Sequence, residues 1–462
     1  MRKTILCALV LFLAVSCTSM SETGYAASPV NGSLSAQARQ VLDYVDRISG
    51  TSTLTGQHDK PGAPTASFNQ AKTITGQYPA LWGSDLGFAS SGLDTMYNRQ
   101  GIVNEAKNKW AAKSLVTLTW HMCRPDRAAP CSWDGNVYNA PLSSQQWNDI
   151  VTPGTALYNQ FIARIDEAVP YLQQLRDANV PVLWRPFHEM NGSWFWWGGN
   201  AANSKKLYRI MYDRYVYTHG LSNLIWVWNV DRPGNGAPAD YYPGSGYVDI
   251  LSMDIYNGDF NASYYNTMLN LAAGKPIALG EVGDLPTPAQ LNSQPKWAYF
   301  MAWTEHLTGS NTNAEIQATY WDPRMITQNE VNLSRENIAY NKPAYASSSE
   351  SASYPASAAF DANGGTRWAS AWNPQEWIYV DLGSVRSVSG VRLAWESAYA
   401  KKYQIQVSGD QVNWTTVYTD ETGTGGEKAI TFPTATARYV KMFAYERATT
   451  YGYSLWEFEV YP

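Results

Sequence analysis

The chain has 462 residues, enough for two or three domains, and a net charge of −5 with only 16% charged residues. It contains no basic run of the kind that captures phosphate groups, which excludes nucleic acid as an expected partner. Its 20 tryptophans and 31 tyrosines exceed what a core needs and are typical of proteins that bind polysaccharides, because each ring offers a flat platform with a polar edge.

The N-terminus has the pattern of an export signal, which we place at residues 1–28. A basic start precedes an apolar stretch at residues 5–15 that is too short to anchor the chain stably in a bilayer. Two processing routes remain open. Cys17 would carry a lipid if residues 13–17 act as a lipoprotein motif, whereas cleavage near Ala26 would release the protein. Release is slightly favoured, and no later segment is long and apolar enough to span a membrane, so we expect a secreted protein.

After the signal, residues 33–48 predict an amphipathic helix, and short apolar segments then alternate with longer helical stretches. The predicted strands are residues 53–57, 78–83, 114–121, 181–189, 223–229, 248–256, 276–281 and 297–303. Helical runs between them include residues 104–113, 158–178 and 205–218. Strands that alternate with helices pair in parallel, and eight such units close into a (β/α)₈ TIM barrel, which we place at residues 33–330. An open doubly wound sheet is the alternative, but no glycine-rich phosphate motif follows the first strand.

Two cysteines remain once the signal region is set aside. Cys123 and Cys131 lie eight positions apart in a protein expected to meet an oxidising environment, which predicts a disulfide between them. Two free thiols are the alternative. A zinc site is not expected, because there are only two thiolates and no nearby histidine pair.

Polar and aromatic residues gather where the predicted strands end. In a (β/α)₈ barrel the carboxyl ends of all strands meet at one rim, and this rim carries the active site. The rim residues are Gln57, His58, Ser84, Asp85, Trp120, His121, Arg185, His188, Glu189, Asp254, Tyr256, Glu281 and Trp303.

Glu189 and Glu281 end the fourth and seventh predicted strands, which face each other across the barrel mouth. Hydrolysis of a glycosidic bond uses two such carboxyl groups, one to protonate the leaving oxygen and one to attack or to activate water. Apolar rings around the acid would raise its pKa by desolvation, while Arg185 and His188 tune the site and Arg185 holds the second carboxyl group ionised. We expect no cofactor or metal in this chemistry, and we assign the other rim carboxylates structural or distant-subsite roles.

The segment RPFHEMNGSWFWWG at residues 185–198 resembles the acid/base segment of glycoside hydrolase family 26, best known for β-mannanases. GEVG at residues 280–283 resembles the nucleophile strand of that family, and the likeness extends over roughly residues 33–332. The resemblance implies a retaining (β/α)₈ hydrolase with Glu189 as acid/base and Glu281 as nucleophile.

The same resemblance implies substrate contacts. His121 matches a histidine that touches sugar near the cleavage point, Tyr256 a tyrosine that orients the nucleophile, and Trp194 and Trp303 tryptophans that stack on sugar. Alternatively, His121 is a hydrogen-bonded residue at the rim without sugar contact, and Tyr256 simply caps its strand. The loop at residues 123–131 departs from the pattern and borders the cleft, so the substrate and the endo or exo mode stay open.

From about residue 332 the sequence pattern changes to frequent turns and β-type segments in which polar and apolar residues alternate. This pattern predicts an antiparallel β-sandwich at residues 332–462. Motifs within it resemble a discoidin, or coagulation factor 5/8 type C, domain, whose bacterial copies are often classed with carbohydrate-binding module family 32; they lie at residues 337–339, 359–368, 377–383 and 454–458. The resemblance implies a structural Ca²⁺, with a metal-free turn as the alternative. The expected calcium ligands are Asp361, Thr366 and Glu457, and the expected sugar contacts are Trp372, Arg447 and Tyr451.

The resemblances together imply an endo-1,4-β-mannanase that acts on mannan or galactomannan and carries a glycan-binding module. We expect this enzyme to be secreted and monomeric. A mixed-linkage β-1,3/1,4-glucan or a β-1,3-xylan is the alternative substrate on the same fold. A non-catalytic glycan-binding protein is a remote alternative, because it would lack one catalytic carboxylate and both are present.

Overall fold

The computed structural model describes residues 29–88, 92, 94, 96–333 and 337–462. The predicted export signal, including Cys17, lies outside the described residues. The chain forms two compact units, Ala26–Arg335 and Glu336–Pro462. Within the described parts of the chain, none of the helices combines the length and apolar character needed to cross a bilayer.

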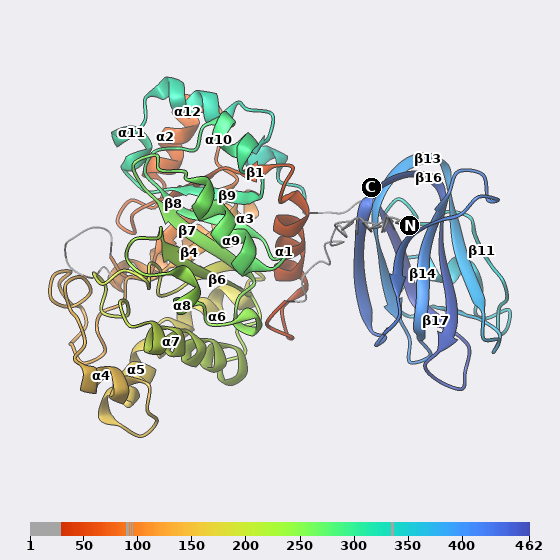
Figure 1. Ribbon diagram of the computed structural model, residues 1–462, viewed down its shortest axis with the longest axis horizontal. Coiled ribbons are helices and arrows are strands. Elements are labelled where there is room, and N and C mark those ends of the chain that lie inside the picture. The colour runs from red at the N-terminus through yellow and green to blue at the C-terminus, as the bar shows by residue number, and fades with distance from the viewer. Residues whose placement is uncertain (1–28, 89–91, 93, 95, 334–336) are drawn as a thin grey trace, which may run out of the picture. The chain divides into compact units, whose positions relative to one another are not determined.

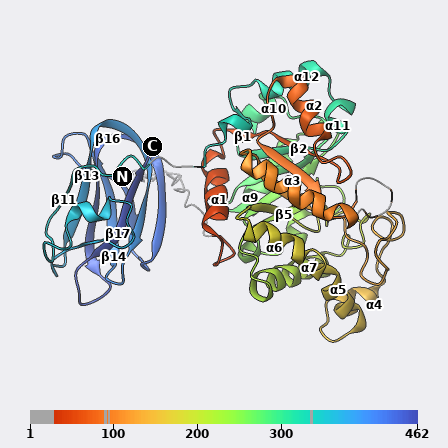
Figure 2. The same cartoon turned by 180° about the vertical axis from the view of Figure 1, so that it is seen from behind.

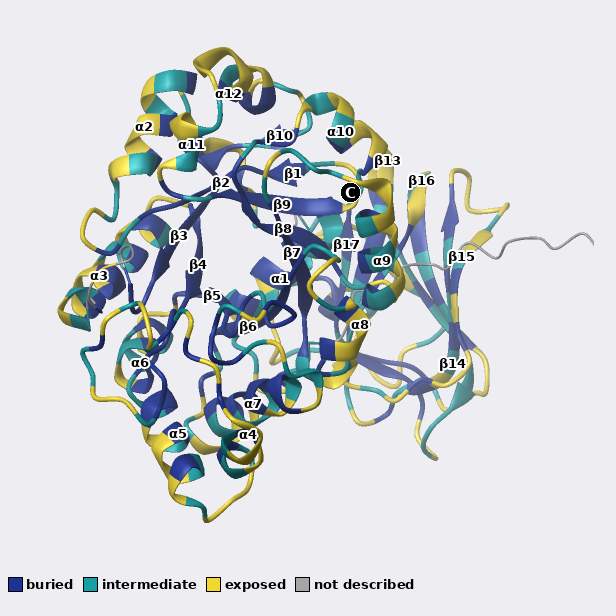
Figure 3. Ribbon diagram, turned by 60° about the vertical axis from the view of Figure 1, so that its left-hand side comes forward, coloured by how far each residue is buried: buried dark blue, intermediate teal, exposed yellow. Residues whose placement is uncertain are grey.

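The first unit is a closed parallel barrel, seen end-on in Figure 3. Strands pair in parallel from β2 to β9, and β9 pairs back with β2 between Ala302 and Gln57, which closes the ring. The predicted TIM barrel is therefore confirmed, and each of the eight predicted strands is present. The barrel strands are β2 (Gly56–His58), β3 (Leu81–Asp85), β4 (Leu115–Thr119), β5 (Val182–Arg185), β6 (Leu224–Asp231), β7 (Ile250–Ile255), β8 (Ile277–Val282) and β9 (Trp297–Ala302). Two short strands extend the sheet from β9: β1 (Thr53–Leu54) pairs with β9, and β10 (Met325–Ile326) pairs with β1.

Every residue of the eight barrel strands is buried, because the strands have the barrel interior on one face and helices on the other. Helix α1 (Ala36–Ile48) packs against β6 and β9, and its Val41 and Val45 belong to the same hydrophobic cluster as first residues of other strands, such as Leu81 and Leu115. This end of the barrel is therefore apolar. The strand starts are sealed by hydrophobic packing, and the polar groups are left at the opposite rim.

Helices cover the outside of the barrel (Figures 1 and 2). The predicted helix at residues 158–178 is wrong as one element: α5 ends at Asp166 and α6 begins at Val169, because proline at the second position of α6 starts a new helix. The main helices are α2 (Ala66–Thr75), α3 (Arg99–Ala111), α4 (Ser144–Ile150), α5 (Ala156–Asp166), α6 (Val169–Asp177), α7 (Ala201–Asp213), α8 (Pro238–Tyr241), α9 (Ala262–Ala272), α10 (Pro288–Ser293), α11 (His306–Gly309) and α12 (Asn313–Tyr320).

The second unit is an antiparallel β-sandwich with its own core around Trp368 and Tyr403. The two longest strands, β13 and β16, pair with each other, and β13 joins two segments that the sequence predicts as separate strands, residues 376–381 and 388–395. The register between the two strands breaks after Asp381 and after Val388, where such strands bend. The strands are β11 (Ala344–Ala346), β12 (Trp368–Ala369), β13 (Glu376–Trp395), β14 (Ala400–Ser408), β15 (Thr415–Asp420), β16 (Glu427–Arg447) and β17 (Ser454–Tyr461), in the order β12-β17-β13-β16-β14-β15 with β11 beside β13.

Candidate active site

Glu189 lies in a tight turn that follows β5. The predicted strand extends to residue 189, but β5 ends at Arg185, and Phe187 and Glu189 both have φ of 51°. This left-handed backbone costs free energy for residues other than glycine, so surrounding contacts must hold it. One such contact is the backbone N–H of Glu189, which donates to Oδ1 of Asn229 on β6 at 2.9 Å.

Glu281 lies on β8, next to a local bulge. Met253 pairs with Leu279 and Asp254 pairs with Glu281, so Gly280 is the extra residue. A Cβ at Gly280 would lie 2.3 Å from Nδ2 of Asn229 and 2.6 Å from Oδ1 of Asp254. Glycine is therefore required where the Asn229–Asp254 hydrogen bond, 2.7 Å long, crosses the strand. The bulge re-aims Glu281 into the barrel mouth.

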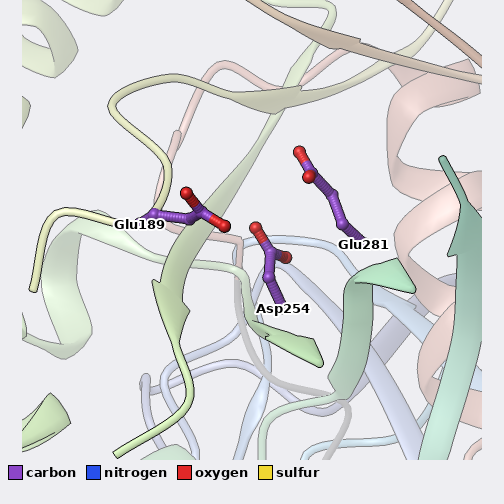
Figure 4. A group of neighbouring side chains, drawn as sticks. All are labelled: Glu189, Asp254 and Glu281. Atoms are coloured by element: carbon purple, nitrogen blue, oxygen red, sulfur yellow. The ribbon is translucent and has the colours of Figure 1, made fainter. Parts of the chain in front are cut away.

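Glu189, Asp254 and Glu281 converge at the rim (Figure 4). An oxygen of each carboxyl group lies within 4.8 Å of an oxygen of each of the other two. The two glutamates that the sequence places on opposite strands therefore meet at one point. The three oxygens could also hold a metal ion, but Arg185 already supplies positive charge to two of these groups.

Arg185 and Tyr256 hold Glu281 from two sides. Nη2 of Arg185 donates to Oε1 of Glu281 at 2.5 Å, and the Tyr256 hydroxyl donates to Oε2 at 2.7 Å. Nη1 of Arg185 also donates to Asp254 at 3.3 Å. Burial opposes the charge on Arg185, but the two carboxylates outweigh it and raise the pKa of the guanidinium. Glu281 is thus bonded as an anion and oriented by fixed donors.

Glu189 has the opposite electrostatic setting. Burial, followed by the negative charge of Glu281, raises the pKa of Glu189 to about 8. Nε1 of Trp194 donates to Oε2 of Glu189 at 2.6 Å and opposes part of this shift. Glu189 therefore keeps its proton at neutral pH. Burial, followed by the negative charge of Glu281, also raises the pKa of Asp254 well above its ordinary value.

Histidines line the side of the mouth next to Glu281. His121, which follows β4, bonds Asp85 through Nδ1, and its Nε2 lies 2.9 Å from Nε2 of His188. His188 Nε2 is 4.0 Å from Glu281 Oε1. His58 stacks on Trp303 with ring centroids 4.1 Å apart, and burial lowers the pKa of His58 to about 3, so it is neutral. This side of the mouth is a packed wall of rings.

Residues 30–330, more than half of the chain, match the model of glycosyl hydrolase family 26. The chain belongs to glycosyl hydrolase family 26. Residues 343–458 match the F5/8 type C domain model.

Several relatives of the family 26 barrel have names or solved structures. A mannan endo-1,4-β-mannosidase of Thermothelomyces thermophilus is 34% identical over 314 residues, which are 65% of this chain and 62% of that protein. The structure of GH26A from Muricauda sp. is 40% identical with a TM-score of 0.63, covering 65% of this chain and 99% of that one. A Podospora anserina GH26-CBM35 β-(1,4)-mannanase is 29% identical with a TM-score of 0.58, covering 67% and 70%. The alignment with the Thermothelomyces protein thus leaves more than a third of that relative unmatched.

The family 26 barrel brings together the predicted rim residues. Arg185, His188, Tyr256 and Trp194 touch one of the two glutamates or lie within 4.0 Å of it, whereas His121 and Trp303 lie one ring further out. The sequence predicts structural or distant-subsite roles for the remaining rim carboxylates, and for Asp254 the distant-subsite alternative is wrong, because its carboxyl group lies within 4.8 Å of both glutamates. Its place at the end of the strand beside Glu281 was the signal that could have located it.

The predicted disulfide between Cys123 and Cys131 is present. It closes the loop that follows His121, and Arg124 fastens the same loop by donating to Asp126 and to the carbonyls of Ala140 and Pro141. The loop that departs from the family pattern is therefore held by both a covalent link and buried hydrogen bonds.

In the F5/8 type C unit, the three predicted calcium ligands lie close together. Glu457 is buried, and neither of its carboxyl oxygens has a hydrogen-bond partner among the described residues. Burial, followed by the negative charge of Asp361, raises the pKa of Glu457. Asp361 also accepts a hydrogen bond from the Thr366 hydroxyl at 2.7 Å. Buried carboxyl oxygens without partners are what a hard cation would satisfy, so the residues fit Ca²⁺.

Proposed function

We propose that this chain is a retaining endo-1,4-β-mannanase in which Glu189 is the acid/base and Glu281 the nucleophile. The observation that carries the proposal is the meeting of the two carboxyl groups, with oxygens within 4.8 Å of each other. Carboxyl groups about 5–5.5 Å apart suit a covalent glycosyl-enzyme, whereas about 6.5–9.5 Å leaves room for water and inverts the anomeric centre.

The opposite settings of the two glutamates support these roles. Glu281, bonded by Arg185 and Tyr256, attacks the anomeric carbon while Glu189 gives its proton to the departing oxygen. Glu189, now ionised, then takes a proton from water. The water oxygen bonds to the anomeric carbon, the bond to Glu281 breaks, and the sugar leaves with its original configuration.

Mannan is proposed as the substrate because the aligned relatives are named mannan endo-1,4-β-mannosidases or β-(1,4)-mannanases. The mixed-linkage glucan and β-1,3-xylan alternatives have no comparable support. A panel of mannan, galactomannan, barley glucan and β-1,3-xylan tests this choice. Preferred hydrolysis of either alternative substrate would overturn it.

The catalytic roles have a sharper test. An aryl β-mannoside with a good leaving group needs no proton, so Glu189→Ala should still form the covalent intermediate on it, whereas Glu281→Ala should not. Asp59→Asn is a matched control: Asp59 is a buried rim carboxylate that caps α2 through the Ser67 N–H at 2.6 Å, away from the glutamates. Near-normal turnover of mannan by either glutamate variant would refute the assignment.

For the F5/8 type C unit we propose a glycan-binding site in a pocket of about 570 Å³. Trp372 and Tyr451 line it, both more than half exposed, with ring centroids 5.5 Å apart. Half-exposed rings suit the C–H face of a sugar. Arg447 instead donates to the carbonyls of Thr450 and Tyr451 and supports the loop. Trp372→Ala should weaken binding to insoluble polysaccharide and leave hydrolysis of soluble oligosaccharides unchanged. Equal binding would count against this pocket.

We further propose that Asp361, Thr366 and Glu457 hold a structural Ca²⁺, and that the protein is exported and acts as a monomer. The unpartnered oxygens of Glu457 support the metal. The basic and apolar pattern of the first residues supports export. A single chain supplies every group of the proposed active site, which supports action as a monomer.

A further inference from the structure

One amide side chain connects the two halves of the proposed active site. Asn229, near the end of β6, is fully buried and makes three hydrogen bonds. Its Oδ1 accepts the backbone N–H of Glu189 at 2.9 Å. Its Nδ2 donates to Oδ1 of Asp254 at 2.7 Å and to the hydroxyl of Ser252 at 2.9 Å. Asn229 therefore contacts the turn after β5 and two residues of β7 at the same time.

The orientation of this amide is fixed by its partners. A backbone N–H can only donate, so the oxygen of Asn229 must face Glu189, and its NH₂ group must face Asp254 and Ser252. The Ser252 hydroxyl donates its own proton to the carbonyl of Trp228 at 3.2 Å and accepts from Asn229 with its oxygen. The amide oxygen and both amide protons are thus used, and no other orientation of the side chain satisfies these contacts.

The bond to Glu189 replaces a strand pairing that is missing. β5 pairs with β6 up to Trp184 and Trp226, and it ends at Arg185. Glu189 lies beyond this end with φ of 51°, so its N–H has no partner in the parallel ladder. The Asn229 side chain supplies the acceptor that a backbone N–H requires away from water. Asn229 therefore stabilises the left-handed turn from which the Glu189 side chain reaches the barrel mouth.

The bond to Asp254 leads to the nucleophile. Oδ2 of Asp254 accepts Nη1 of Arg185 at 3.3 Å, and Nη2 of the same guanidinium donates to Oε1 of Glu281 at 2.5 Å. Hydrogen bonds thus run without a gap from Asn229 to the Glu281 carboxylate. Together with the bond to the Glu189 backbone, they place both glutamates against the same buried amide.

Gly280 on β8 leaves the space that this cluster occupies. A Cβ at this position would lie 2.3 Å from Nδ2 of Asn229, 2.6 Å from Oδ1 of Asp254 and 2.9 Å from Oγ of Ser252. Contacts this short would force the three polar groups apart. The strands β6 and β7 therefore supply the hydrogen-bonding groups, and β8 supplies the room for them.

We propose that Asn229 is a positioning residue that sets the place of the acid/base Glu189 relative to the nucleophile Glu281. The inference rests on the proposed roles of these two glutamates. Without the Asn229 oxygen, the Glu189 turn relaxes and its carboxyl group is misplaced for proton transfer to the leaving oxygen. The defect should therefore depend on how much the leaving group needs a proton. A general loosening of the fold would instead affect all substrates alike.

The experiment compares kcat/KM on a soluble mannooligosaccharide, whose leaving group needs a proton, and on an aryl β-mannoside with a good leaving group, which does not. Asn229→Ala should lower kcat/KM on the mannooligosaccharide by on the order of a hundredfold, the effect of a misplacement of about 1 Å. Its loss on the aryl mannoside should be smaller by roughly tenfold or more. Asn229→Leu keeps the branched shape without the polar atoms and carries the same expectation where Asn229→Ala does not fold.

Asn229→Asp separates the two functions of the amide. A carboxyl group can accept the Glu189 N–H whether or not it is protonated, so this variant keeps the bond that places the acid/base. Any loss that arises through Asp254 should then be the same for both substrates. Equal losses on the two substrates in Asn229→Ala, or a larger loss on the mannooligosaccharide in Asn229→Asp, would overturn the proposal.

Ser252→Ala is the matched control. It removes one hydrogen bond of Asn229 from an equally buried position and leaves the bonds to Glu189 and Asp254 in place. The ratio of the two kcat/KM values should stay that of the unaltered protein, and a changed ratio would count against the proposal. Glu189→Ala, measured in parallel, separates the two levels of the argument. Equal losses on both substrates in Glu189→Ala would reject the proposed function itself, whereas equal losses confined to Asn229→Ala would reject only the role of Asn229.

Discussion

Trp194 donates a hydrogen bond from its indole Nε1 to Oε2 of Glu189 across 2.6 Å. This bond stabilises the ionised form of a carboxyl group that burial and Glu281 otherwise keep protonated, with a pKa of about 8. Protonated Glu189 delivers the proton in the first step, so activity should be lost as pH rises through this value. Burial and the charge of Glu281 therefore place the basic limb of the pH profile, and the Trp194 hydrogen bond moves it to lower pH.

Trp194→Phe removes the donor and keeps most of the ring. We expect the basic limb of kcat/KM to move to higher pH, because the indole N–H stabilises the ionised carboxyl group more than the protonated one. The measurement is a pH profile on soluble mannooligosaccharides. Trp372→Phe, in the other unit, is the control and should not move it. A shift of the limb to lower pH would show that Trp194 does not act through the carboxylate.

Gly192→Ala tests how the Trp194 ring is held. A Cβ at Gly192 would lie 2.4 Å from carbons of the Trp194 indole, so the ring must move away. We expect the basic limb to move in the same direction as in Trp194→Phe, together with a loss of about tenfold or more in kcat/KM. Gly101→Ala serves as control, since nothing lies within 4 Å of a Cβ there. Normal kinetics for Gly192→Ala would mean that the position of the Trp194 indole over Gly192 does not matter for catalysis.

Arg185→Met should cost both folding stability and turnover, whereas Tyr256→Phe should have a smaller effect, mainly on turnover. Loss of Arg185 leaves Glu281 buried without its ion-pair partner, which should destabilise the fold by about 3–5 kcal/mol and nearly abolish turnover. Loss of the Tyr256 hydroxyl removes one hydrogen bond to Glu281, worth about 1.5–3 kcal/mol, and should mainly lower kcat. Denaturant unfolding and steady-state kinetics separate the two effects. Equal stability loss in both variants would contradict this ranking.

Replacement of Cys123 and Cys131 by serine should lower the free energy of unfolding by about 2–3 kcal/mol, from the entropy of the short loop that the bond closes in the unfolded chain. Chemical denaturation of the double variant against the unreduced protein measures this. The buried hydrogen bonds of Arg124 should keep the loop in place, so kcat on mannan should change little. A collapse of activity with unchanged stability would point to a direct role of the loop in the cleft.

Removal of divalent cations should lower the melting temperature of the F5/8 type C unit and leave that of the barrel unchanged. The reason is that Glu457 would lose a cation bound by its buried oxygens, which have no hydrogen-bond partner among the described residues. Calorimetry with and without chelator, followed by added Ca²⁺, measures this. Glu457→Gln should abolish the response to Ca²⁺. An equal response of both units, or none, would argue against the site.

The sequence by itself determined the barrel, the sandwich and the two glutamates. Eight apolar runs alternating with helical ones leave few topologies, and carboxyl groups at the ends of parallel strands must share a rim. The break between α5 and α6 was missed, because a proline is tolerated in the first turn of a helix and was read as lying inside a longer one.

The tertiary structure alone decided how the rim groups pair. The bulge at Gly280, the left-handed turn at Glu189 and the hydrogen-bonded chain from Asp85 to Thr119 depend on distances between strands that are far apart in sequence. Hydrogen-bond direction and desolvation change over tenths of an ångström, whereas hydrophobic periodicity specifies only which face of an element is buried. Sequence patterns therefore predict that Glu189 and Glu281 lie at the barrel mouth. Only the packing decides that Glu189 holds a proton and that Glu281 pairs with Arg185.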